Sequence, residues 1–326
     1  DWNSTLPPSD NKYFYPGASI TWNYTDRFHI PGMNSGQFRF SWADVGNGTA
    51  RYFANNQYGL GYLAGLNNIN AITVTPPSNI LPGALKPERK REFEVGINNS
   101  FFPGNRLVLD ISFYTNNRYN QIISLPTSVT SSSTGLLINA ANMRSSGLEF
   151  QITGTPVLTK DIRWDITVNG ANQQSKVLDL GYGLSNYNKE NLINGSGAYI
   201  AANVGQAYGN IMMEDYTRNS KGDRIVNSSG LYTLNSGNPI VAGNIMPKLY
   251  GGVLSDFNYK NFSFRIGLDY KYGGTIFSYT NERLTGLGQL KSTLKYRDAA
   301  HGGIPYYIDG NGKYVALPTG TTSAPS

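Results

Sequence analysis

A strict alternation of apolar and polar residues over 261–274, NFSFRIGLDYKYGG, constrains the fold of this chain more than any other feature. Apolar side chains occupy every second position from Phe262 to Tyr272, and polar residues, three of them charged, lie between them. A period of two predicts a β-strand with one apolar face and one polar face. Two environments fit such a strand: a soluble sheet between a core and water, or a membrane sheet between lipid and a wet lumen.

The same period recurs along the chain and predicts eight strands in all. The composition agrees, because charged residues make up only 15% of the chain, Tyr occurs 23 times, and Asn, Ser, Thr and Gly fill much of the rest. This suits many strands joined by polar loops, and no stretch is typical of a long helix. The expected strands are Tyr13–Thr25, Gln37–Ala43, Glu92–Phe102, Arg106–Arg118, Gly147–Thr155, Ile162–Gln173, Leu249–Phe257 and the stretch 261–274.

Short and long connections alternate between these strands. The expected short turns are 103–105, about 156–161 and 258–261, with a somewhat longer turn at 26–36, and the expected long loops are about 48–91, 120–146, 174–248 and 275–326. In an antiparallel barrel this order places the short turns on one rim and the long loops on the other, as in outer-membrane barrels with short periplasmic turns and long extracellular loops. The pattern predicts an all-β fold, an antiparallel transmembrane β-barrel, with 1–326 as one partial barrel domain.

The charged side chains of the strands lie on the polar faces. An Arg or Lys that faced lipid near the bilayer midplane would cost about 2–4 kcal/mol, and the alternation avoids this cost. We expect five such residues to line a lumen: Arg163, Asp165, Arg265, Asp269 and Lys271. They either solvate the inner wall and pair across strands, or they line a path for a solute.

Aromatic residues near the strand ends favour the membrane interpretation. Trp22, Trp42, Trp164, Tyr270 and Tyr272 fit the aromatic girdles of a membrane barrel. Half-buried aromatic residues of a soluble sheet remain the alternative.

Several functional classes are excluded or disfavoured. The chain has no Cys, so disulfides, thiolate metal sites and a Cys nucleophile are excluded. His29 and His301 are the only histidines and lie far apart in the sequence, so we expect no metal site, no cofactor and no catalytic residue. The net charge of +6 is spread thinly along the strands, which disfavours a nucleic-acid partner. The chain contains no run of 18 apolar residues, so we expect no transmembrane helix.

The expected directions of the strands suggest a larger barrel. If the long loops are extracellular, both ends of the chain lie outside the cell, whereas we expect the termini of a bacterial barrel on the periplasmic side. We therefore expect a piece of a larger barrel that lacks the final strands. A self-contained barrel of about eight strands is the competing interpretation.

Several segments resemble the SusC-like branch of the TonB-dependent transporters from Bacteroidetes outer membranes. Residues 85–114, LKPERKREFEVGINNSFFPGNRLVLDISFY, are similar to the family's Leu-Lys-Pro-Glu segment, Glu-x-Gly strand and following Leu-rich strand. Residues 137–157 match the family's Asn-x-Gly-x-x-x-Asn-x-Gly-x-Glu pattern at Asn139 and Gly147–Glu149, although Ala141 stands where other members often have Gly. Further similar segments are 161–177, 204–211, 243–252 and 7–22, in the family's order.

The resemblance implies a fold and a function. Such a barrel has about 22 strands and a plug in its lumen, and this chain would be the C-terminal part of the barrel, with the plug and the TonB-contacting segment before residue 1. The implied activity is the TonB-dependent import of a large nutrient, an oligosaccharide fragment or a peptide, across the bacterial outer membrane. The implied partners are a SusD-like surface lipoprotein at the extracellular mouth, TonB, outer-membrane lipid and the substrate. The lumen charges would then line the solute path or hold the plug.

Four tyrosines in the longest loop are candidates for contact with a substrate or partner: Tyr182, Tyr187, Tyr199 and Tyr208. They either stack on sugars or contact a partner, or they pack the loop itself. Two other functional classes remain open for the chain, namely a passive porin-like barrel and a soluble β-rich glycan-binding or adhesin domain.

Overall fold

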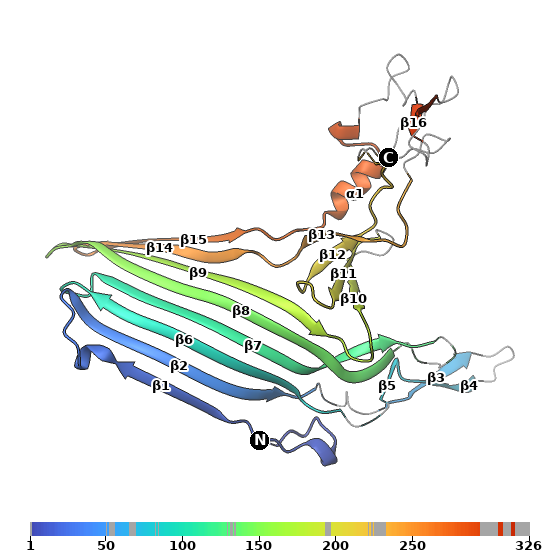
Figure 1. The fold of residues 1–326 in the computed structure, drawn as a ribbon, viewed down its shortest axis with the longest axis horizontal. Helices are drawn as coiled ribbons and strands as arrows, with labels where there is room; N and C mark the ends of the chain where they lie inside the picture. The colour runs from blue at the N-terminus through green and yellow to red at the C-terminus, as the bar shows by residue number, and fades with distance from the viewer. Residues whose placement is uncertain are drawn as a thin grey trace. The chain divides into compact units, whose positions relative to one another are not determined.

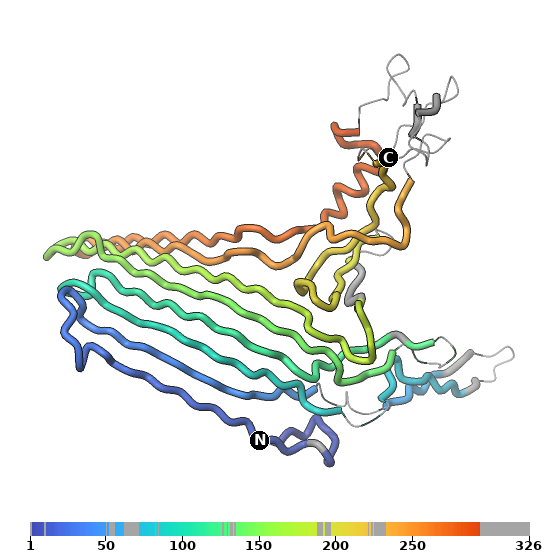
Figure 2. Tube along the Cα trace, viewed as in Figure 1, coloured from blue at the N-terminus to red at the C-terminus, as the bar shows by residue number. Residues whose placement is uncertain are grey.

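The computed structural model describes residues 2–49, 51, 56–64, 70–81, 83, 85–128, 130, 133, 135–192, 197–220, 222, 224, 233–293, 306–308 and 314–316 (Figures 1 and 2). The chain divides into two compact units. The first contains Asp1–Asn186, Asn203–Ala207 and Pro247–Gly273, and the second contains Tyr187–Ala202, Tyr208–Met246 and Gly274–Ser326.

A sheet of eight long strands dominates the first unit. Each strand runs antiparallel to the next, in the order β1-β2-β6-β7-β8-β9-β14-β15, and short β5 (Asn79–Ile80) pairs in parallel with β8 (Figure 1). The order in the sheet follows the order in the chain, so the predicted all-β, antiparallel fold class is confirmed. The strands are β1 (Gly17–Asn23), β2 (Met33–Asn47), β6 (Glu88–Phe101), β7 (Leu107–Pro126), β8 (Gly135–Leu158), β9 (Ile162–Asp179), β14 (Leu249–Tyr259) and β15 (Phe262–Tyr272).

The prediction of a long loop at 120–146 is wrong over most of this range. β7 and β8 continue as a ladder from Gln121 opposite Ala141 to Pro126 opposite Gly135, so only 127–134 connects them. The register shifts twice between Arg118 and Ile122, and Asn120 has a φ of +54°. A bulge of this kind interrupts the period of two, which is why the alternation seemed to end at Arg118.

The other long connections also contain regular structure. The connection after β2 holds the hairpin β3 (Gly59–Ala64) and β4 (Asn70–Thr75), and β6 begins at Glu88, inside the expected loop. In its described residues, the second unit holds a four-stranded sheet, a two-stranded hairpin and an α-helix with Ser278 as its N-cap. Its elements are β10 (Asn186–Asn191), β11 (Tyr199–Asn203), β12 (Asn210–Met213), β13 (Ile240–Asn244), α1 (Tyr279–Gly286), β16 (Tyr306–Ile308) and β17 (Tyr314–Ala316). Among the described residues, no helix is long and apolar enough to cross a membrane.

The two faces of the large sheet differ in chemistry. On one face, Leu268 lies opposite Val253, which lies opposite Val168, and the other alternate residues of β15 continue this apolar surface. We call it the apolar face, and the opposite surface the polar face. Leu268 is 64% exposed, and Phe262, Phe264 and Ile266 on the same face of β15 are also exposed. A contiguous apolar surface of this kind needs an apolar surrounding, which lipid supplies.

Two segments that carry the family resemblance meet at the end of the sheet with the long connections. The Asn139 amide nitrogen donates to the backbone oxygen of Lys86 (2.7 Å), and its side-chain oxygen accepts from the backbone nitrogen of Lys86 (2.8 Å). Beside this contact, Leu85 and Leu137 are buried together with Leu6. Asn139 thus fixes the chain that enters β6 against β8.

Two glycines on the apolar face bring β9 and β14 close together. Gly170 lies opposite Gly251, and a Cβ on Gly251 would lie 2.1 Å from the backbone oxygen of Asn169. Phe150 and Tyr270 cover the space left by the glycines, and the Tyr270 hydroxyl donates to the Asn169 oxygen at 2.9 Å. Aromatic rings over strand glycines restore the packing that the glycines lack.

Candidate functional site

The polar face forms a continuous wall across the sheet. Cross-strand register places Arg39 of β2 opposite Gly96 of β6, and Gly96 opposite Ser112 of β7. Ser112 lies opposite Glu149 of β8, which continues the same row. The alternation of each strand sets this arrangement, because side chains at every second position share one face.

A bidentate ion pair crosses three strands of this wall. The Arg39 guanidinium donates to both carboxylate oxygens of Asp110, at 2.6 and 3.2 Å. Asn98 donates to the same carboxylate at 2.9 Å. Gly96 makes the crossing possible, since a Cβ there would lie only 3.1 Å from the Arg39 guanidinium. Paired donors of this type fix the direction of both side chains.

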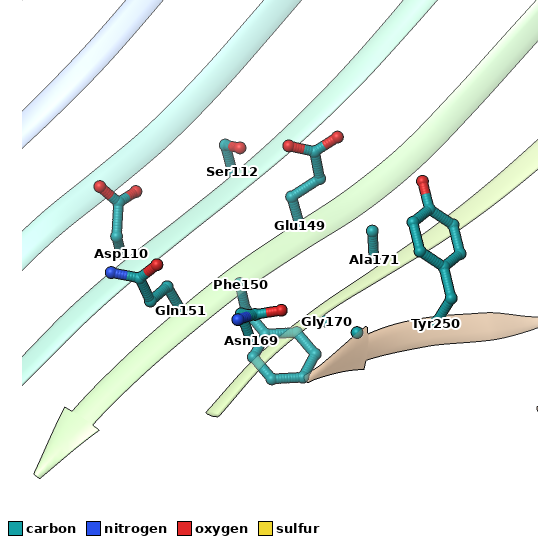
Figure 3. A pocket seen from close by; sticks show the side chains of 10 residues that line it. Asp110, Ser112, Glu149, Phe150, Gln151, Asn169, Gly170, Ala171 and Tyr250 are labelled. Carbon is teal, nitrogen blue, oxygen red and sulfur yellow. The ribbon is translucent and has the colours of Figure 1, made fainter. Parts of the chain in front are cut away.

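A shallow cavity of about 320 Å³ lies beside this ion pair, and its lining combines polar side chains with Phe150, Ala171 and two glycines. In Figure 3 the side chains of Asp110, Glu149 and Tyr250 project to one side of the strands, and Phe150 is directed to the other side. Among the described residues, Glu149 forms no salt bridge. The cavity therefore presents a carboxylate that is available to a cationic or hydrogen-bonding group.

The five expected lumen residues all lie on the polar face. Arg163 pairs with Asp165 at 2.6 Å, and Asp165 also accepts a hydrogen bond from Thr155 at 2.6 Å. Arg265 forms an ion pair with its cross-strand partner Asp256, which lies opposite Asp165, so these four charges form a balanced cluster of two adjacent rows.

Asp269 and Lys271 lie further along the same face of β15, nearer the end of the sheet with the long connections. They are opposite Gly252 and Tyr250 respectively. Neither forms a salt bridge with another described residue. Like Glu149, they carry charge that the sheet itself does not neutralise.

The sequence analysis did not single out Arg39, Asp110 or Glu149 as site residues. Each lies on the polar side of a predicted strand, so the alternation assigned the correct face. Their proximity depends on the pairing of β2, β6, β7 and β8 and on the absence of a side chain at Gly96, and neither follows from the pattern of one strand.

The four candidate loop tyrosines are divided between the two units. Tyr182 belongs to the first unit, where it lies in a turn with a φ of +52° and is 76% exposed. Tyr187, Tyr199 and Tyr208 belong to the second unit and are only half-exposed. Tyr182 is therefore the most accessible of the four for a partner or substrate.

The candidate site contains no metal-binding arrangement among the described side chains. No group of three or more His, Asp or Glu residues in the described ranges is placed to hold a metal ion. His29 lies in the turn between β1 and β2, and His301 is outside the described residues.

Comparison with protein families identifies the architecture. The family model described as "TonB dependent receptor-like, beta-barrel" matches residues 1–307. The chain belongs to this family. Its members are outer-membrane receptors and transporters, which agrees with the exposed apolar face and the charged polar wall of the sheet.

Two curated relatives support this assignment. TonB-dependent receptor P26 of Formosa agariphila is 23% identical over 184 residues, which cover 55% of this chain and 18% of the relative. TonB-dependent receptor SusC of Bacteroides thetaiotaomicron is 24% identical over 247 residues, which cover 71% of this chain and 24% of the relative. The predicted resemblance to SusC-like transporters is confirmed. The chain spans about a fifth to a quarter of the length of these relatives.

Solved structures share the fold. The structure of the RagAB peptide transporter superposes with a TM-score of 0.64 and 16% identity, over 83% of this chain and 30% of the other. The RagAB peptide importer in its "closed-closed" state gives a TM-score of 0.65 and 17% identity, over 84% of this chain and 31% of the other. These likenesses establish the arrangement of strands.

Proposed function

We propose that this chain forms part of the barrel wall of an outer-membrane transporter that imports a large nutrient with energy delivered by TonB. The observation that carries the proposal is the two-faced sheet of a TonB-dependent receptor-like barrel, in which one face is apolar and exposed and the other carries ordered charges. This arrangement separates lipid from a polar interior. We assign the chain a transport role rather than an enzymatic one.

The substrate class in this proposal is an oligosaccharide fragment or a peptide, and the partner is a SusD-like surface lipoprotein. Two observations support it: the relationship to SusC and the shared fold with the RagAB peptide transporter. The end of the sheet that carries the long connections would be extracellular, and it would present exposed residues such as Tyr182 to the lipoprotein or the substrate. TonB would act through a part of the protein other than this sheet.

Uptake by intact cells tests this function directly. Cells that lack the protein should lose uptake of either a labelled oligosaccharide or a labelled oligopeptide. Cells that carry the protein but lack TonB should show the same loss. A surface lipoprotein should co-purify with the protein in mild detergent. Uptake that persists without TonB would indicate a passive porin-like barrel, and absence of the protein from the membrane fraction would support the soluble alternative.

The charges that have no salt bridge within the sheet should influence transport more than the paired charges. We expect Glu149→Gln/Asp269→Asn to change the uptake rate of the transported solute several-fold, because these carboxylates face the interior without a neutralising partner. The measurement is the initial rate of uptake at matched levels of protein in the outer membrane.

The matched control is Arg163→Gln/Asp165→Asn, which removes one charge of each sign from an ion pair on the same face. This control should leave the rate nearly unchanged. Equal effects of the two double variants, or no effect of Glu149→Gln/Asp269→Asn, would mean that the polar-face charges only solvate the wall.

A further inference from the structure

A row of basic side chains crosses the apolar side of the sheet just beyond its apolar residues. The register places Asp44 opposite Arg91, Arg91 opposite Asn117, Asn117 opposite Arg144, and Arg144 opposite Lys176. Asp44, Arg91 and Lys176 lie near the ends of β2, β6 and β9 that carry the long connections, whereas β7 and β8 continue beyond Asn117 and Arg144. We call this set, together with Arg89 in the next row, the basic row.

The basic row follows the apolar surface closely on β2 and β6, whereas on β9 Gly170, Asn172 and Gln174 separate Lys176 from Val168. Arg91 is the next residue on this side after Phe93, and Asp44 is the next after Trp42. On β8, Ser146 separates Arg144 from Leu148. On β2 and β6 the basic row therefore begins where the lipid-facing surface ends, which is the level of the lipid headgroups.

The charges of the basic row are not balanced within the sheet. Four cations and one carboxylate give it a net charge of +3. Asp44 is almost fully buried, with its side chain 4% exposed, and it pairs with both Arg89 (2.8 Å) and Arg91 (3.0 Å). Arg144 and Lys176 are direct cross-strand partners of like charge, an arrangement that destabilises a sheet unless an anion lies between or beside them.

The positions of two guanidinium groups are fixed by neighbours. Arg144 Nε donates to Asn117 at 2.8 Å, and the Arg91 guanidinium lies over the ring of Tyr119 at 5.8 Å from its centroid. Arg144, Arg91 and Lys176 are all exposed. Neighbouring strands are about 4.8 Å apart, so the cations of the row form a band wide enough to contact more than one phosphate.

Three cations of the polar face have acidic partners within the sheet, whereas Lys271 on the same face forms no salt bridge with a described residue. On that face, Lys90 pairs with Glu92 at 2.5 Å, Arg39 pairs with Asp110, and Arg163 pairs with Asp165. Acidic partners thus accompany these cations of the interior wall, whereas the cations at the lipid border exceed their one acidic partner. Among the described residues, Arg144 and Lys176 form no salt bridge, so the basic row keeps an excess of positive charge.

We propose that the basic row binds the phosphate groups of phosphorylated lipid headgroups in the outer leaflet of the outer membrane. The proposal rests on the membrane placement of the family and is independent of which solute is transported. Guanidinium and ammonium groups that lie at the depth of anionic headgroups attract them strongly. The bound headgroups would neutralise the row and tie the barrel wall to the surrounding lipid.

Lipid binding to the purified protein tests this site. The probe is a bisphosphorylated lipid A, compared with the same lipid after removal of its phosphates, and the bound lipid is measured by native mass spectrometry in detergent. The wild-type protein should prefer the phosphorylated lipid. Arg91→Gln/Arg144→Gln should weaken binding of the phosphorylated lipid about tenfold and leave binding of the dephosphorylated lipid unchanged.

The matched control is Lys90→Gln/Arg118→Gln, because these two cations are cross-strand partners on β6 and β7 but belong to the polar face. It removes the same charge and should retain the preference for the phosphorylated lipid. Folding of each variant is checked by the mobility shift between boiled and unboiled samples, and Asp44 keeps its pairing with Arg89 in the test variant.

Three outcomes would overturn the proposal. The first is equal weakening by the two double variants, and the second is a lipid preference that does not depend on phosphate. The third is displacement of the lipid by millimolar inorganic phosphate, which would indicate a site for free phosphate. A change in oligomeric state in Arg91→Gln/Arg144→Gln without a change in bound lipid would instead assign the row to a protein interface.

Discussion

Leu268→Arg is expected to lower the free energy of unfolding of the barrel in lipid by about 2–4 kcal/mol. Leu268 lies in the middle of β15 on the apolar face, opposite Val253, and is 64% exposed. A guanidinium there would have to be transferred from water into hydrocarbon. The measurement is the denaturant dependence of unfolding in lipid vesicles, followed by tryptophan fluorescence and by gel mobility without boiling.

Leu254→Arg is the matched control for this prediction. Leu254 lies on the adjacent strand β14 opposite Gly267, and the register places it on the polar face. The same substitution should therefore cost much less, because the new charge would face the interior of the barrel. If the two variants lost equal stability, or if Leu254→Arg lost more, the assignment of the two faces to lipid and interior would be wrong.

Gly251→Ala is expected to destabilise the sheet by about 1–3 kcal/mol. The new methyl group would lie 2.1 Å from the backbone oxygen of Asn169 and 2.8 Å from the Tyr270 hydroxyl, so β9 and β14 would have to separate. The hydrogen bond from Tyr270 to Asn169 would be strained at the same time. The free energy of unfolding in lipid vesicles measures this loss.

Gly267→Ala provides the comparison within the neighbouring strand. The nearest atom to a Cβ at Gly267 is a flexible Leu254 methyl group at 3.8 Å, which is an ordinary contact. This variant should be neutral or slightly stabilising, since alanine loses less backbone entropy on folding than glycine. Similar stability of Gly251→Ala and the wild type would show that β9 and β14 are not held together by the close approach of their glycines.

Cross-strand charged residues differ between the two faces of the sheet. On the polar face, Arg39 reaches across Gly96 to Asp110, so the sheet supplies the counter-charge itself. On the apolar side, Arg144 and Lys176 are adjacent without an acidic partner between them. The proposed binding of lipid phosphates would supply the counter-charge that the sheet does not provide for this pair.

Much of the fold follows from local pattern. The alternation over β15 and seven other segments predicted every long strand of the sheet, and the short turns predicted which strands are neighbours. The prediction failed at the ends of the strands, above all between Arg118 and Gly147, because the bulge near Asn120 removes the period of two while the ladder of hydrogen bonds continues. A register shift depends on the pairing with the partner strand, so the residue pattern of a single strand does not predict it.

The sequence by itself determined which residues share the apolar face and which share the polar face, because the side-chain period of a strand is two and every residue has only these two faces. It also placed Arg163, Asp165, Arg265, Asp269 and Lys271 together on one wall. Only the tertiary structure decided which side chains from different strands meet. Pairing between strands joined Asn139 to Lys86, Arg39 to Asp110, and Arg144 to Lys176 across tens of residues of sequence. Those contacts depend on register and on glycines that leave space, and both are properties of the assembled sheet.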